Sequence, residues 1–217
     1  DTLASRGNLA NAYQAAGRLN EAIPLHQQNL EDRIHILGPH HPDTLTARNN
    51  LAVAYHDAGR LDEAIPLYQQ TLEDQTHILG PDHPHTLTTR HNLASAYQAA
   101  GRPDEAIPLH EQNLEDRTRI LGPHHPDTLT ARHNLAGAYR DTGRLDEAIT
   151  LYERNFEDCN HILGPDHPGT LTSRNNLASA YLAVGRTEEA EALFETPSDS
   201  ADEQDGTEED RDPETGD

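Results

Sequence analysis

Lysine, methionine and tryptophan are absent from this chain of 217 residues, and aromatic side chains make up only 4% of it. All 16 basic residues are therefore arginines. So few large apolar side chains give little material for one large hydrophobic core. A thin core spread along a repeat array suits this composition better, because each repeat buries only one face against its neighbours.

Long apolar runs are also missing. No run approaches the roughly 20 residues that a membrane span requires, and the first residues given do not show the basic-then-apolar pattern of a signal peptide. Cys159 is the only cysteine, so no intramolecular disulfide can form, and we expect a reducing, cytoplasmic location. The chain starts without methionine and inside a repeat, so we expect it to be the C-terminal part of a longer protein.

Negative charge dominates the sequence, with a formal net charge of −22. Residues 1–195 carry 28 acidic side chains and 15 arginines, and residues 196–217 carry 10 and one. Nucleic acid and anionic membranes are bound by clusters of Lys and Arg, so we expect neither as a partner. Residues 196–217 contain almost nothing apolar, and we predict that they form a disordered acidic tail.

A repeat of 42 residues organises the rest of the chain. The segment 43–52 (DTLTARNNLA) recurs at 127–136 as DTLTARHNLA, and variants of it begin at Asp1, His85 and Gly169. The repeat divides residues 1–195 into four full units and one partial unit. Their ranges are 1–42, 43–84, 85–126, 127–168 and 169–195.

Each unit is predicted to contain two helices, over 43–58 and 62–79 in the second unit. The first begins at His41-Pro42-Asp43, with proline in the first turn, and it ends at Gly59. The second begins at Asp62, a favourable N-cap, and it ends at Gly80-Pro81. We expect an all-α, right-handed solenoid of antiparallel helix pairs. Its predicted core positions in this unit are Leu51, Ala52, Tyr55, Ala64, Ile65 and Leu72.

Residues 50–52, Tyr55 and 59–65 (NLA, Y and GRLDEAI) resemble the signature of the tetratricopeptide repeat. The 42-residue period and the linker Leu79–Pro84 are similar to the kinesin light chain subtype, which also occurs in bacterial STAND-type signalling ATPases. The resemblance implies a protein- or peptide-binding scaffold without enzymatic activity or cofactor. It also implies that the chain is the recruitment or sensor arm of a larger protein.

In this family the first helices line a concave groove, and an Asn in the first half of each helix often holds the ligand backbone. The matching positions are Asn8, Asn50, Asn92, Asn134 and Asn176. Asn49, His91, His133 and Asn175 add polar groups beside this row, and Val53, His56, Ser95, Gln98 and Arg140 would add specificity. The alternative is that each Asn only bonds to its neighbouring helix.

A second row consists of arginines on the apolar stripe of the first helices. Because a charge there is costly unless it is paired, we expect an ion pair with a carboxylate of the second helix, such as Glu63 or Glu73. The alternative is a cationic row that binds an acidic peptide. The row comprises Arg6, Arg48, Arg90, Arg132 and Arg174.

The remaining candidates for chemistry favour no active site. Histidines recur once per unit in the linkers, as at His41 and His83, and we interpret them as capping residues and expect no metal site. Cys159 replaces Arg33 and Arg117 of other units, so we predict an exposed, variable position. The alternative function is a structural spacer, or a self-association module that uses the uncapped N-terminal edge.

Overall fold

The computed structural model describes residues 2–194, and these residues form ten helices. The predicted acidic tail lies outside the described residues. The helices are α1 (Thr2–Ala15), α2 (Leu19–Leu37), α3 (Pro42–Asp57), α4 (Leu61–Ile78), α5 (Pro84–Ala99), α6 (Pro103–Leu121), α7 (Pro126–Asp141), α8 (Leu145–Leu163), α9 (Pro168–Ala183) and α10 (Thr187–Ala192).

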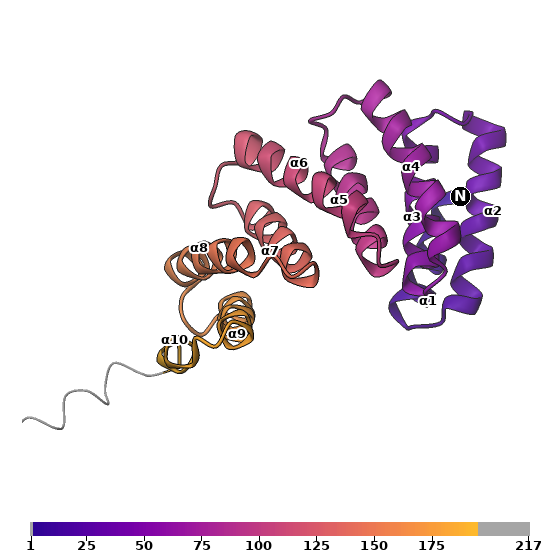
Figure 1. Cartoon of the computed structure of the whole chain (residues 1–217). Coiled ribbons are helices and arrows are strands. Elements are labelled where there is room, and N and C mark those ends of the chain that lie inside the picture. The colour runs from indigo at the N-terminus through magenta and orange to yellow at the C-terminus, as the bar shows by residue number, and fades with distance from the viewer. Residues whose placement is uncertain (1, 195–217) are drawn as a thin grey trace, which may run out of the picture.

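Each helix packs against the helix before it and the helix after it, and the antiparallel pairs stack into a curved array (Figure 1). We call α1, α3, α5, α7 and α9 the inner helices, and α2, α4, α6, α8 and α10 the outer helices. Inner helices also touch one another, as α3 and α5 do. The predicted all-α solenoid is therefore confirmed.

The turn inside each pair depends on one glycine. Gly59 has φ 71°, the left-handed conformation that ends a helix at little cost for glycine. The N–H of Gly59 bonds to the carbonyl of His56 at 2.9 Å, and the N–H of Arg60 bonds to that of Tyr55 at 2.9 Å. Both bonds satisfy carbonyls at the end of α3.

The start of the outer helix differs from the prediction. Asp62 is not the N-cap, because α4 begins at Leu61 and Arg60 precedes it. The Arg60 guanidinium lies 4.5 Å from the centre of the Tyr55 ring and bonds to Glu63 at 2.7 Å. This arginine thus joins the end of α3 to the first turn of α4, and the arrangement recurs in every pair.

The linkers between pairs end in a histidine cap. The Nδ1 atom of His41 accepts the N–H of Asp43 at 3.2 Å, and Pro42 occupies the first helical position. The hydroxyl of Thr44 donates to the carbonyl of Gly38 at 2.8 Å. The same cap is formed by His83, His125 and His167, which confirms the interpretation of these histidines as capping residues.

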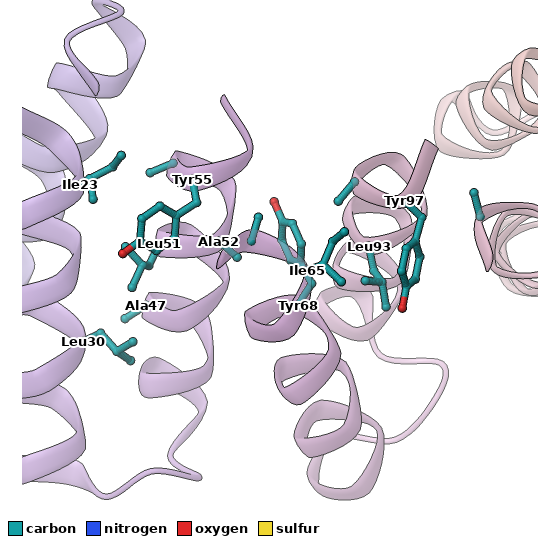
Figure 2. Close-up of a cluster of buried hydrophobic side chains, with 14 residues drawn as sticks. Ile23, Leu30, Ala47, Leu51, Ala52, Tyr55, Ile65, Tyr68, Leu93 and Tyr97 are labelled. Atoms are coloured by element: carbon teal, nitrogen blue, oxygen red, sulfur yellow. The ribbon is translucent and has the colours of Figure 1, made fainter. Parts of the chain in front are cut away.

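The core is thin and consists of two clusters along the array, one of which ends and the other begins in α6. Between α2 and α4, helix α3 buries Leu51, Ala52 and Tyr55. The same buried cluster continues toward α5 through Ile65 and Tyr68 of α4 (Figure 2). Of the predicted core positions in the second unit, only Leu72 is partly exposed. Each layer is shared by neighbouring helices, so the stability of one unit depends on the next unit.

The arginine row forms the predicted ion pairs, but with a different carboxylate. Arg48 is 4% exposed, and its guanidinium contacts Asp74 at 2.5 Å and the carbonyl of Pro39 at 3.2 Å. Glu63 and Glu73 were wrong as partners, because Glu63 pairs with Arg60 and Glu73 is exposed. One residue is about 100° around a helix, so only Asp74 faces α3.

The other arginines follow this pattern up to the last pair. Arg90 contacts Asp116 at 2.6 Å, Arg132 contacts Asp158 at 2.5 Å, and Arg6 pairs with Asp32. Arg174 instead lies 4.9 Å from the Phe194 ring. Since these guanidiniums face the outer helices, the arginine row does not present cations to a ligand.

Candidate ligand-binding groove

A stripe of exposed and partly exposed side chains follows the inner helices at spacings of four, three and four residues. In α3 the stripe consists of Thr46, Asn50, Val53 and Asp57. It lines recesses of about 370 Å³ between α3 and α5 and about 340 Å³ between α1 and α3. We call this stripe and its equivalents the inner groove.

The predicted Asn row lies in the inner groove. Asn50, Asn92, Asn134 and Asn176 are partly exposed, and Asn8 is exposed. Asn50 borders three recesses. Two of these side chains also approach the preceding inner helix, Asn92 at 3.4 Å from Asn49 Oδ1 and Asn134 at 3.5 Å from His91. These contacts are long for hydrogen bonds, so the amides keep most of their bonding capacity.

The row beside it contacts both the next inner helix and the outer helices. Asn49 accepts the Thr89 hydroxyl at 3.2 Å, and the rings of His91 and His110 lie 6.1 Å apart. Burial lowers the pKa of His91 and His133, so both are neutral at pH 7. Asn175, the last member of this row, is exposed.

The predicted specificity residues fall into two groups. Val53 and Ser95 lie on the stripe, and Val53 borders the recess between α1 and α3. His56, Gln98 and Arg140 lie one helical turn further on.

In this second group, Gln98 and Arg140 both bond to Asp141, and His56 lies 3.7 Å from Asp57. The second group therefore borders the groove through contacts with aspartates of the inner helices.

Sequence reasoning missed the floor of the groove, which the outer helices supply. Asn29, Gln75, Asn113 and Asn155 are buried there, and the side-chain oxygen of each has no hydrogen-bond partner in the described part of the chain. Asn29, Asn113 and Asn155 share one position of the repeat, three residues after a buried His or Tyr of the outer helix, and this helical spacing was the available signal. Cys159 also lies in this layer at 4% exposure, so the prediction of an exposed position was wrong, and burial raises the pKa of its thiol.

No helix within residues 2–194 combines the length and the apolar character needed to cross a bilayer. No group of three or more His, Cys, Asp or Glu side chains among the same residues is arranged to hold a metal ion.

A family model described as tetratricopeptide repeat matches residues 1–76, 49–115, 88–154 and 130–196. A solved structure of nearly identical TPR-like repeats is 37% identical in sequence to this chain. It comes from a Podosopora anserina protein provisionally designated a kinesin light chain. It covers 88% of this chain and 90% of its own, with a TM-score of 0.80. A solved point variant of the same repeats is 36% identical over the same shares, with a TM-score of 0.81.

BtubC (BKLC) from P. vanneervenii shares the fold at 24% identity. The match covers 86% of this chain and 74% of that chain, with a TM-score of 0.75. No sequence among the curated proteins is significantly similar to this chain.

Proposed function

This chain belongs to the tetratricopeptide repeat family, and we propose that it is a scaffold that holds a protein or peptide ligand in the inner groove. The Asn row carries the proposal. A carboxamide offers one acceptor and two donor hydrogens, so it can bond to both the N–H and the C=O of an extended ligand backbone. We further propose that the array is the recruitment or sensor arm of a larger cytoplasmic protein and acts by binding, without catalysis.

The position of the Asn side chains supports this assignment. Asn50, Asn92 and Asn134 recur once per unit on the same face of successive helices, and each is only partly exposed. Substituting them leaves the buried Leu, Ala and Tyr layer intact. Substitutions in the Asn row should therefore change the affinity for the ligand without changing the fold of the array.

The test uses a peptide selected from a displayed library on the intact chain. One net hydrogen bond contributes about 0.5–1.5 kcal/mol, so Asn92→Ala should weaken binding several-fold. Asn92→Ala with Asn134→Ala should weaken it further, roughly additively. Isothermal titration calorimetry measures both affinities, and Gln70→Ala, on the exposed side of α4, is the control. Unchanged affinity in a normally folded double variant would assign the Asn row to structure alone.

Self-association is the second candidate function. Leu9 is 47% exposed on α1, whereas its equivalents Leu51, Leu93 and Leu135 are buried. An exposed leucine at the edge of a stack can pack against a second copy. Sedimentation of the chain and of Leu9→Gln tests this, because a monomeric parent at all concentrations excludes it.

A further inference from the structure

The junctions between units alternate in chemistry along the array. One position of the outer helix, on the groove floor, holds Arg33, Gln75, Arg117 and Cys159 in turn. The facing position at the start of the next inner helix holds Asp43, His85, Asp127 and Gly169. The Arg–Asp pair thus recurs with a period of two units, or 84 residues, at the first and third junctions only, whereas the second and fourth junctions hold two different pairs.

Ion pairs close the first and third junctions. Arg33 contacts Asp43 at 3.2 Å, and Arg117 contacts Asp127 at 2.7 Å. Next to the first pair, the recess that Asn29 and Arg33 line has a volume of only about 150 Å³, and the recess of about 340 Å³ between α1 and α3 lies toward the other end of these helices, around Gln14 and Asp57. We call these two the closed junctions.

The second and fourth junctions lack this pair and are open. Thr46, Asn49, Gln75, His85 and Thr89 line the second, with a recess of about 370 Å³. Leu129, His133, Asn155, Cys159 and Leu163 line the fourth, with a recess of about 260 Å³. Neither lining set contains an arginine or a carboxylate.

Each open junction has an unpaired acceptor at its floor. Gln75 is 1% exposed, and its Oε1 has no hydrogen-bond partner among the described residues. Asn155 is 3% exposed, and its Nδ2 donates to Ser173 at 3.3 Å while its Oδ1 lacks a partner in the same part of the chain. A buried acceptor without a donor is unfavourable, so a ligand N–H that reaches it gains binding energy.

Charge decides which kind of donor these recesses favour. Residues 1–195 have a net charge of −13, which attracts cations to the whole array. At the closed junctions, Arg33 and Arg117 lie one helical turn from the unpaired oxygens of Asn29 and Asn113, so the guanidinium of an ion pair already occupies the position that a cationic ligand group would take. The open junctions have no such arginine.

We propose that the two open junctions bind the Lys or Arg side chains of a basic, extended polypeptide. The aliphatic part of each side chain would lie in the recess, and its N–H groups would donate to Gln75 and Asn155. Contacts with the basic side chains would then recur every second unit. The closed junctions would only hold neighbouring units together. This inference rests on the proposed function, because it requires the groove to hold the ligand backbone.

Matched variants for a test are made by giving one junction the residues of another. Gln75→Arg with His85→Asp gives the second junction the chemistry of the first, and Cys159→Arg with Gly169→Asp does the same for the fourth. Arg117→Gln with Asp127→His opens the third. Each double substitution leaves the net charge unchanged with His neutral, so general electrostatic attraction stays constant. Circular dichroism verifies the fold of each variant.

The probes are fluorescein-labelled octa-arginine and octa-glutamine, measured by fluorescence anisotropy at physiological ionic strength. Closing both open junctions should weaken octa-arginine binding about tenfold or more, and opening the third should strengthen it. Gln75→Leu, which removes the side-chain amide without adding a charge, should weaken it several-fold. The parent should prefer octa-arginine to octa-glutamine.

Three results would overturn the proposal. They are no octa-arginine binding by the parent, equal affinity for both peptides, and unchanged affinity after both open junctions are closed. The Asn92→Ala and Asn134→Ala variant separates this inference from the proposed function. If that variant binds its selected peptide more weakly while the junction variants leave octa-arginine binding unchanged, the groove is correct and the basic ligand is wrong.

Discussion

Replacing Arg48 by methionine should destabilise the array strongly, because it leaves one member of an ion pair behind. Removing one partner of a buried pair costs about 3–5 kcal/mol. Asp74 keeps some access to water at 17% side-chain exposure, and the His40 Nδ1 remains 3.5 Å from it. The carbonyl of Pro39, an exposed residue, can bond to water. We therefore expect the lower end of the range, about 3 kcal/mol.

The matched comparison uses the neighbouring acidic residues. Asp74→Asn removes the partner charge of a guanidinium that is 4% exposed, so it should also cost several kcal/mol. Glu73→Gln changes an exposed side chain and should stay within about 0.5 kcal/mol. The two substitutions are adjacent and remove the same charge, so only the direction of the side chain distinguishes them.

Urea unfolding followed by circular dichroism gives these free energies by linear extrapolation. The Arg48→Met and Asp74→Asn double variant should recover part of the loss, because neither charge is then left without its partner. Equal midpoints for Asp74→Asn and Glu73→Gln, or an Arg48→Met variant within about 1 kcal/mol of the parent, would refute the structural account of this row.

Two further predictions concern glycine and histidine. Gly59→Ala should cost about 1 kcal/mol because φ is 71°, whereas Gly137→Ala, within α7 and with its new Cβ 3.6 Å from Tyr152, should gain about 0.5–1 kcal/mol. Opposite shifts in thermal midpoint would verify this, and shifts of the same sign would contradict it. Burial lowers the pKa of His110 from 6.5 to about 4. Between these pH values the unfolded chain therefore binds more protons than the folded chain. Protonation of His110 should then lower the free energy of unfolding by roughly 2 kcal/mol as pH falls from about 7 to about 5. His110→Tyr, which introduces the residue found at positions 68 and 152, should abolish this contribution to the pH dependence of stability. An unchanged pH dependence of that variant in urea titrations would exclude the role of His110.

The repeat made the fold predictable to within a residue or two. The spacing of Leu51, Ala52 and Tyr55 and the glycine at 59 define the first helix and its end. The start of the second helix was misplaced, because Asp62 is a strong capping residue while Arg60 acts through a ring contact. That contact depends on Tyr55, a residue of the preceding helix, and local capping rules do not include it.

The site was less predictable, because its floor comes from a different helix. Asn50 and its equivalents could be placed on the inner helices by helical spacing. The depth at which Gln75 and Cys159 lie depends on how α4 and α8 approach the next pair. Cys159 is small and replaces arginines in other units, which suggested solvent exposure. In the structure, the same position is buried beneath the next inner helix.

The two-unit period limits how such an array can lengthen or shorten by duplication or loss of its units. Loss of residues 43–84 would join the first unit to the third, so that Arg33 faced His85 and lost its acidic partner. Gln14, which donates to Asp57 at 2.7 Å, would then face Ala99. Loss of residues 43–126 would instead bring Arg33 to Asp127 and Gln14 to Asp141, and both contacts would be restored. Arrays of this kind should therefore vary in length by pairs of units, since a step of 84 residues keeps the Arg–Asp and Gln–Asp contacts and a step of 42 residues breaks both.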